Sequence, residues 1–135
     1  MDKLQTFRAF VGPAQRQAIY SAMQGEEGEW FRAKVRELTA AFVTMPQVYE
    51  QESLGEYAIV HLHYFTGSAD WYITERDLDG PQHQAFGLTD LFGDGGELGY
   101  ISIAELIRYG AELDLHFAPR TLATVRRERS SRLAA

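Results

Sequence analysis

The chain has 135 residues, of which 45% are hydrophobic and 13% aromatic, and its formal net charge is −6. This length fits one domain with a single core, and this composition excludes an intrinsically disordered chain. Because cysteine is absent, disulfide frameworks and thiolate metal sites are excluded as well.

The charge is distributed unevenly along the chain. Residues 50–116 contain thirteen carboxylates and two arginines, a local balance of −11, whereas residues 118–135 contain five arginines and one glutamate. An acidic body repels nucleic-acid phosphate and attracts basic surfaces. We therefore expect a protein partner with a basic surface and no direct nucleic-acid binding by the body. The alternative is that the acidic groups only keep a small protein soluble.

No apolar run is long enough for a membrane span, and the first residues lack the apolar core of a signal peptide. We therefore expect a cytoplasmic protein that does not contact a membrane. The sequence predicts no cofactor and no particular oligomeric state.

The N-terminal third has the residue spacing of helices. Residues 1–12 suit a short helix or an apolar arm, and a second helix begins at Pro13 and ends at Gly25. A third helix ends before Pro46 and has the clearest apolar stripe. The stripe consists of Phe31, Val35, Leu38 and Phe42. Amphipathic helices ahead of a sheet need a surface to cover, so we expect these helices to pack on it.

Residues 57–117 contain five apolar runs with two-residue alternation, separated by glycine, proline and aspartate. They predict strands over 57–65, 70–77, 85–92, 97–103 and 112–117. The short turn at 66–69 predicts an antiparallel hairpin. Gly87 predicts a bulge or a close backbone approach within its strand, and the glycine-rich segment 93–96 predicts a flexible hairpin loop.

Ser102 and Glu105 have capping-box spacing for a short helix that ends at Gly110. Together the elements predict an α+β fold. N-terminal helices pack on one face of a mainly antiparallel five-stranded sheet, with the short helix before the last strand.

The sequence predicts one α+β domain followed by a basic segment. We assign residues 1–118 to the domain, with a helical segment at 1–46 and the sheet at 57–117. After residue 118 the apolar spacing is weak, at Leu122, Val125 and Leu133. We therefore expect a basic C-terminal tail or a frayed helix over 119–135.

Four segments of the sheet region resemble the pattern of the domain of unknown function 2958 family. That pattern is an aromatic-rich strand followed by W-Y-x-T-E, an F-G run, E-L-G-Y-x-S-x-x-E-L and a closing D-L-x-F segment. The matching residues are Trp71, Tyr72, Thr74, Glu75, Phe86, Gly87, Glu97, Leu98, Gly99, Tyr100, Ser102, Glu105, Leu106, Asp114, Leu115 and Phe117. The helical N-terminal segment, the His-Leu-His of the first strand and the arginine-rich tail depart from the pattern, so the chain resembles a divergent branch.

The resemblance implies a genetic setting. Proteins of this family are commonly encoded on plasmids, phages and integrative elements, often near anti-restriction genes. The resemblance implies no activity and no catalytic residue.

Four side chains of metal-binding type lie on two predicted strands. His61 and His63 share one strand face, and Asp114 and His116 share another. If the first and last strands are neighbours, these four side chains converge as ligands of a metal ion. The alternative function is therefore a metal-dependent enzyme, and the competing interpretation is that these are ordinary surface histidines.

Glu75 and Glu97 both lie in the family-like motifs and suit a carboxylate pair for acid–base chemistry. The local interpretation is that Glu75 pairs with Arg76 and Glu97 caps the glycine-rich turn. Because the sequence has no nucleophile–base pair and no phosphate-binding motif, we assign no catalytic residue.

Aromatic and acidic side chains form the binding surface that we predict. It consists of Trp71, Tyr72, Glu75, Asp77, Asp79, Asp90, Asp94, Glu97 and Tyr100. Aromatic groups amid carboxylates suit an interface with a basic partner. In the alternative, helices on one face of the sheet and the tail on the other bury the aromatic groups.

We therefore expect a non-enzymatic accessory protein of a mobile genetic element. It binds a host or element protein through its acidic, aromatic surface and so counters host defence, in the manner of anti-restriction or anti-CRISPR proteins.

Overall fold

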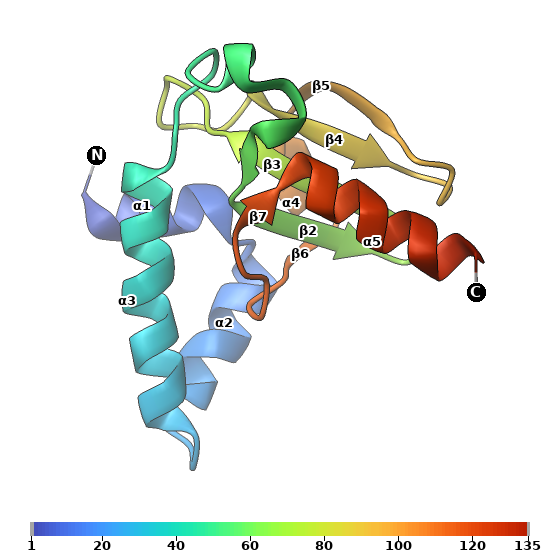
Figure 1. The fold of residues 1–135 in the computed structure, drawn as a ribbon. Coiled ribbons are helices and arrows are strands. Elements are labelled where there is room, and N and C mark those ends of the chain that lie inside the picture. The colour runs from blue at the N-terminus through green and yellow to red at the C-terminus, as the bar shows by residue number, and fades with distance from the viewer. Residues whose placement is uncertain (1, 135) are drawn as a thin grey trace.

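A computed structural model of the chain describes the backbone of residues 2–134 and the side chains of residues 2–131. The chain begins with helices α1 (Lys3–Phe10), α2 (Pro13–Ala22) and α3 (Gly28–Thr44) (Figure 1). A capping box starts α1, in which the carboxylate of Asp2 accepts the N–H of Gln5. Helix α2 begins at the predicted Pro13 but ends at Ala22, ahead of the predicted Gly25, and α3 ends before Pro46 as predicted.

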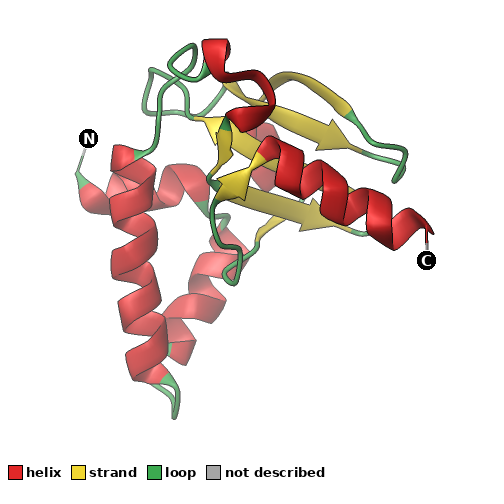
Figure 2. Cartoon of the chain, in the orientation of Figure 1, coloured by secondary structure: helices red, strands yellow, loops and turns green. Residues whose placement is uncertain are grey.

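Five strands form the main sheet, in the order β5-β4-β3-β2-β6. They are β2 (Leu62–Thr66), β3 (Ala69–Glu75), β4 (Ala85–Asp90), β5 (Glu97–Ile101) and β6 (Glu112–Leu113). Each neighbouring pair is antiparallel. Helix α4 (Ile103–Arg108) separates β5 from β6, and the Ser102 side chain caps it by accepting the N–H of Glu105. The predicted α+β class, with N-terminal helices, a five-stranded sheet and a helix before its last strand, is confirmed (Figure 2).

The predicted first and last strands are both shorter in the structure. The first divides into β2 and a separate strand, β1 (Ile59–Val60), which pairs with β7 (Arg120–Thr121) in a two-stranded ribbon. The last ends at Leu113 because the chain turns at Asp114, whose carboxylate accepts the N–H of His116 at 2.9 Å.

Two apolar cores lie on opposite faces of the sheet. The larger core joins α1, α3 and α4 to side chains of β2 and β3, and buried Tyr64 donates a hydrogen bond from it to the carbonyl of Phe10. The smaller core lies under helix α5 (Leu122–Ala134), which crosses the other face (Figure 1). It consists of Val60, Tyr72, Leu88, Leu122 and Val125.

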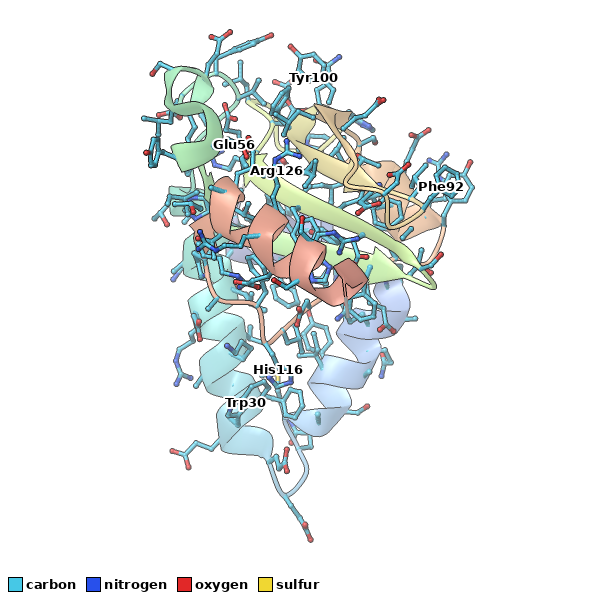
Figure 3. The ribbon with its side chains drawn as sticks, turned by 45° about the vertical axis from the view of Figure 1, so that its right-hand side comes forward. Trp30, Glu56, Phe92, Tyr100, His116 and Arg126 are labelled. Atoms are coloured by element: carbon cyan, nitrogen blue, oxygen red, sulfur yellow. The ribbon has the colours of Figure 1, made fainter. Side chains whose placement is uncertain are left out.

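The C-terminal segment is therefore a packed helix rather than a free basic tail. Leu122 and Val125 are each 1% exposed, while the side chain of Leu133 lies outside the described residues. Two of its arginines form ion pairs within the fold: Arg120 pairs with Glu128, and Arg126 lies 2.8 Å from Glu56 (Figure 3). Carboxylates of the same chain thus pair with much of the positive charge of this segment.

Candidate functional site

The connector between α3 and β1 is held on the sheet by backbone and side-chain hydrogen bonds. The N–H of Val48 donates to the carbonyl of Arg76 at 2.9 Å. Buried Gln51 donates to the carbonyls of Thr74, at 2.7 Å, and Ile59, at 2.9 Å, and its carbonyl oxygen accepts the N–H of Ile59 at 2.7 Å. These hydrogen bonds hold the connector in place, so that it forms one wall of a site. The sequence shows only that the connector is polar.

A cavity of about 290 Å³ lies between this connector, strands β3 to β5 and the start of α5. The connector contributes the 3₁₀ helix η1 (Glu52–Tyr57) to its rim. The cavity's walls are mostly apolar, formed by Val48, Ala58, Phe86, Leu98 and Leu122. Among the described residues that line it, none is lysine or arginine.

Glu75, the last residue of β3, lines this cavity and is 4% exposed. Its Oε1 lies 3.4 Å from the N–H of Gln51, and its Oε2 accepts a hydrogen bond from the Thr74 hydroxyl at 3.1 Å. Among the described residues, no cation forms an ion pair with it. A carboxylate with two neutral contacts is costly to bury, so the site favours a positive ligand group.

Two tyrosines stand at the rim of the cavity. The hydroxyls of Tyr49 and Tyr100 are 2.5 Å apart, and the ring of Tyr100 meets that of Phe86 edge to face, with centroids 5.7 Å apart. The hydrogen bond between the two hydroxyls raises the pKa of Tyr100, and the negative charges of Glu52 and Glu75 add to the effect. Tyr49 has a φ of 81°, a left-handed conformation that is strained for a bulky residue.

The residues of the predicted binding surface divide into buried and accessible groups. Tyr72, Glu75, Asp77 and Asp90 are buried. Trp71 is partly buried against the larger core. Asp79, Asp94, Glu97 and Tyr100 are exposed. The surface that a partner can reach is therefore smaller than the sequence suggested, and only Glu75 and Tyr100 of the predicted set line the cavity.

Asp77 and Asp90 are buried because each binds groups of the fold. The carboxylate of Asp77 accepts the backbone N–H groups of His83, at 3.1 Å, and Gln84, at 2.9 Å, and so organises the loop before β4. The carboxylate of Asp90 is bound by Arg129 of α5. The contact between Asp90 and Arg129 joins distant segments of the chain, and sequence spacing does not reveal it.

The four residues of the predicted metal cluster do not converge. His63 lies between two carboxylates, with Nδ1 3.0 Å from Asp114 and Nε2 2.7 Å from Asp70. His116 instead lies beside Trp30, with ring centroids 5.3 Å apart, at the helical end of the molecule (Figure 3). In the described part of the chain, no group of three or more His, Asp or Glu side chains is arranged to hold a metal ion.

His61 also lies apart from the other three. Its backbone N–H donates to the carbonyl of Ile73 at 2.8 Å, at the break between β1 and β2. Partial burial lowers the pKa of the His61 imidazole from 6.5. The strand adjacency that the metal hypothesis needed does occur between β2 and β6, but it joins only His63 to Asp114.

A second groove, of about 630 Å³, lies between α1, α2 and α3. Its lining is largely apolar, with Lys3 and Arg36 as its charged members, and both are exposed. Because no buried charged group faces this groove, it offers less specific chemistry than the cavity beside Glu75.

Sequence reasoning missed several residues of the cavity. Phe86 and Leu98 lie in the family-like motifs, as Glu75 does, and in the structure all three line the cavity. Their shared place in the motifs was the signal that could have grouped them. Tyr49 and Gln51 carry no local signal, because their roles depend on contacts with residues more than twenty positions away.

A protein-family model described as "Protein of unknown function (DUF2958)" matches residues 34–128. The matched range includes every residue that lines the cavity beside Glu75. Comparisons with curated proteins and with solved structures gave no significant match. Over residues 2–134, no helix combines the length and the apolar character that crossing a bilayer requires.

Proposed function

Because the chain belongs to the DUF2958 family, whose description assigns no activity, we propose a function from the geometry of its cavity. The domain is a non-enzymatic binding protein that captures a partner protein by a basic side chain. That side chain enters the cavity and meets the carboxylate of Glu75.

The observation that carries this proposal is the uncompensated burial of Glu75. Glu75 is 4% exposed and lines an apolar cavity. Among the described residues, the only partners of its carboxylate are the N–H of Gln51 and the hydroxyl of Thr74. A carboxylate held in this way gains more from a cation than one in water does, because the local dielectric constant is lower. The aromatic rings of Phe86 and Tyr100 add cation–π attraction for the same group.

The exposed carboxylates support the same partner chemistry at longer range. Asp79, Asp94 and Glu97 are exposed in a segment whose local balance is −11. A surface of one sign raises the association rate of an oppositely charged partner, although each exposed charge contributes little to affinity.

The biological setting is a second part of the proposal. Its support is the family membership together with the resemblance to proteins of plasmids, phages and integrative elements. We propose that the chain is an accessory protein of a mobile element, and that its basic partner belongs to a host defence system of the restriction or CRISPR type. In this role the cavity binds a side chain that the defence protein needs for its own activity. Catalysis by the chain itself is then unnecessary.

The proposal is tested by affinity capture from host lysate followed by mass spectrometry. The bait is the full chain, compared with Glu75→Gln and with Glu112→Gln, an exposed carboxylate on β6 at the opposite edge of the sheet. We expect a basic protein that the wild type and Glu112→Gln retain and that Glu75→Gln loses. Equal capture of all partners by Glu75→Gln contradicts the proposal.

The setting is tested separately in cells. Expression of the wild-type chain should raise the plating efficiency of a restricted phage in a host with an active restriction or CRISPR system, and Glu75→Gln should not. If neither the wild type nor the variant changes plating efficiency in any such host, the defence role is wrong. The binding function is then judged by the capture experiment alone.

A further inference from the structure

We infer that the side chain taken by the cavity beside Glu75 is that of lysine rather than arginine. The inference rests on the proposed function, which requires only a basic side chain. It names the chemical class of the ligand: a primary ammonium group on a flexible aliphatic stem.

The surroundings of the carboxylate favour a single-point cation. Arginine binds carboxylates best when its planar guanidinium donates two parallel hydrogen bonds to the two oxygens. Both oxygens of Glu75 already have neighbours in the fold, Oε1 the N–H of Gln51 and Oε2 the hydroxyl of Thr74. These contacts take one of the roughly two acceptor sites on each oxygen. A guanidinium fork needs the remaining site on both oxygens at once, whereas an ammonium group binds as a compact charge and needs only one of them.

The size of the cavity fits one aliphatic side chain. Its volume, about 290 Å³, lies at the lower limit of the roughly 300–1,000 Å³ that drug-sized ligands and cofactors occupy. Val48, Ala58 and Leu98 give it apolar walls that can cover the four methylene groups of a lysine stem.

The rim offers further acceptors for an ammonium group. In the pair of Tyr49 and Tyr100 hydroxyls, the O–H of one donates to the oxygen of the other, and both oxygens retain lone pairs. Glu52 also lines the cavity, and its negative charge acts on the same phenol pair. A lysine ammonium has three donors, so Glu75 and the phenol oxygens together can replace the water that it loses on entry.

The test is a titration of the ¹⁵N-labelled full chain, followed by two-dimensional NMR, with three acetylated tripeptide amides. They have the sequence Gly-X-Gly, where X is lysine, arginine or norleucine, so that charge and shape vary while the backbone stays constant. We expect the lysine peptide to shift the amide signals of Thr74, Phe86 and Leu98. We expect it to bind about tenfold more tightly than the arginine peptide, a difference that corresponds to about 1.4 kcal/mol. The norleucine peptide should cause no shifts at the cavity.

Two variants test the cause of the preference. Glu75→Gln should lose lysine binding. Thr74→Val removes the hydroxyl that contacts Oε2, so it should reduce the preference for lysine over arginine.

The inference is overturned if arginine binds as tightly as lysine, if norleucine matches lysine, or if the lysine peptide leaves the cavity signals unchanged. If lysine loses this comparison while partner capture still depends on Glu75, the proposed function survives and only the choice of lysine is wrong. If partner capture does not depend on Glu75, the proposed function itself fails.

Discussion

Arg129 of α5 and Asp90 of β4 form a buried ion pair that joins the C-terminal helix to the centre of the sheet. Nε and one terminal nitrogen of Arg129 lie 2.9 and 2.5 Å from Oδ2 of Asp90, whose side chain is fully buried. Arg129 also donates to the hydroxyl of Tyr72 at 2.8 Å and lies 3.3 Å from Asp70. Because Asp70 also binds His63, these residues form one polar network beneath α5.

Replacing Arg129 with methionine should destabilise the protein by about 3 kcal/mol or more, because it leaves the carboxylate of Asp90 buried without its cation. The free energy of unfolding, measured by urea denaturation, checks this. Arg127→Met is the matched control on the same helix, since Arg127 is exposed and should matter little. The double variant Arg129→Met with Asp90→Asn should recover part of the lost stability. If Arg129→Met loses no more stability than Arg127→Met, the ion pair does not hold α5 on the sheet.

The same pair predicts how stability depends on pH. Burial acts to raise the pKa of Asp90, but hydrogen bonds from Arg129 and from the N–H of Gly93, with the charge of Arg129, outweigh it and lower the pKa from 3.8. A carboxyl group with a lowered pKa in the folded state binds fewer protons there than in the unfolded state. Its contribution is therefore fully present above the unfolded pKa of about 3.9 and is lost as the pH falls through the folded value.

We therefore expect the difference in unfolding free energy between wild type and Asp90→Asn to stay constant between about pH 7 and pH 5. It should shrink as the pH falls below 3.8. A difference that stays constant or grows in acid would contradict the assignment of the lowered pKa to this residue.

Gly87→Ala should disrupt the centre of the sheet. A Cβ at position 87 would lie within 1.9 Å of the backbone oxygen of Tyr72, so β3 or β4 must shift, and the expected cost is about 3 kcal/mol. Gly99→Ala, on β5, is the control, because a Cβ there meets nothing within 4 Å. Denaturation curves should separate the two variants, and equal stabilities would show that the sheet adjusts without cost.

Gly87 also illustrates what the sequence could predict. A glycine inside an apolar, alternating run predicts a bulge or a close backbone approach, and both occur: the register shifts between Ile73 and Glu75, opposite this glycine. Such features depend on local patterns, as do the helix that ends before Pro46 and the capping box at Ser102. The order of elements and the fold class follow from these patterns.

The remaining features depend on contacts between distant residues. Helix α5 has little apolar periodicity, and it packs on the sheet because Leu122 and Val125 fill the smaller core while Arg129 reaches Asp90. Likewise, the alternation of the first strand placed His61 on one face with His63, but no local pattern shows that the strand breaks between β1 and β2. The candidate site was therefore only partly predictable, with Glu75 and Tyr100 found and the connector residues missed.

Tyr49→Phe should lower the pKa of Tyr100 toward its ordinary value of 10.0. The hydrogen bond with the Tyr49 hydroxyl is the largest cause of the raised pKa, and phenylalanine removes that hydroxyl while keeping the ring. An NMR titration of ¹³C-labelled tyrosine rings measures the change. Tyr57→Phe, an exposed tyrosine in η1, should leave the pKa of Tyr100 unchanged, and an unchanged value in Tyr49→Phe would mean that the two hydroxyls do not interact in solution.

Glu75→Gln should leave the unfolding free energy unchanged or raise it by about 1 kcal/mol, since it removes a buried charge that no cation among the described residues compensates. Glutamine keeps an oxygen for the N–H of Gln51 and can still bond the hydroxyl of Thr74. Asp90→Asn is the contrasting variant, because it removes a buried charge that Arg129 does compensate, and it should lose stability. A carboxylate kept for binding costs stability, whereas one kept for folding provides it. If Glu75→Gln instead loses more than about 1 kcal/mol, the carboxylate holds the connector on the sheet, and the loss of binding in this variant can no longer be attributed to the missing charge.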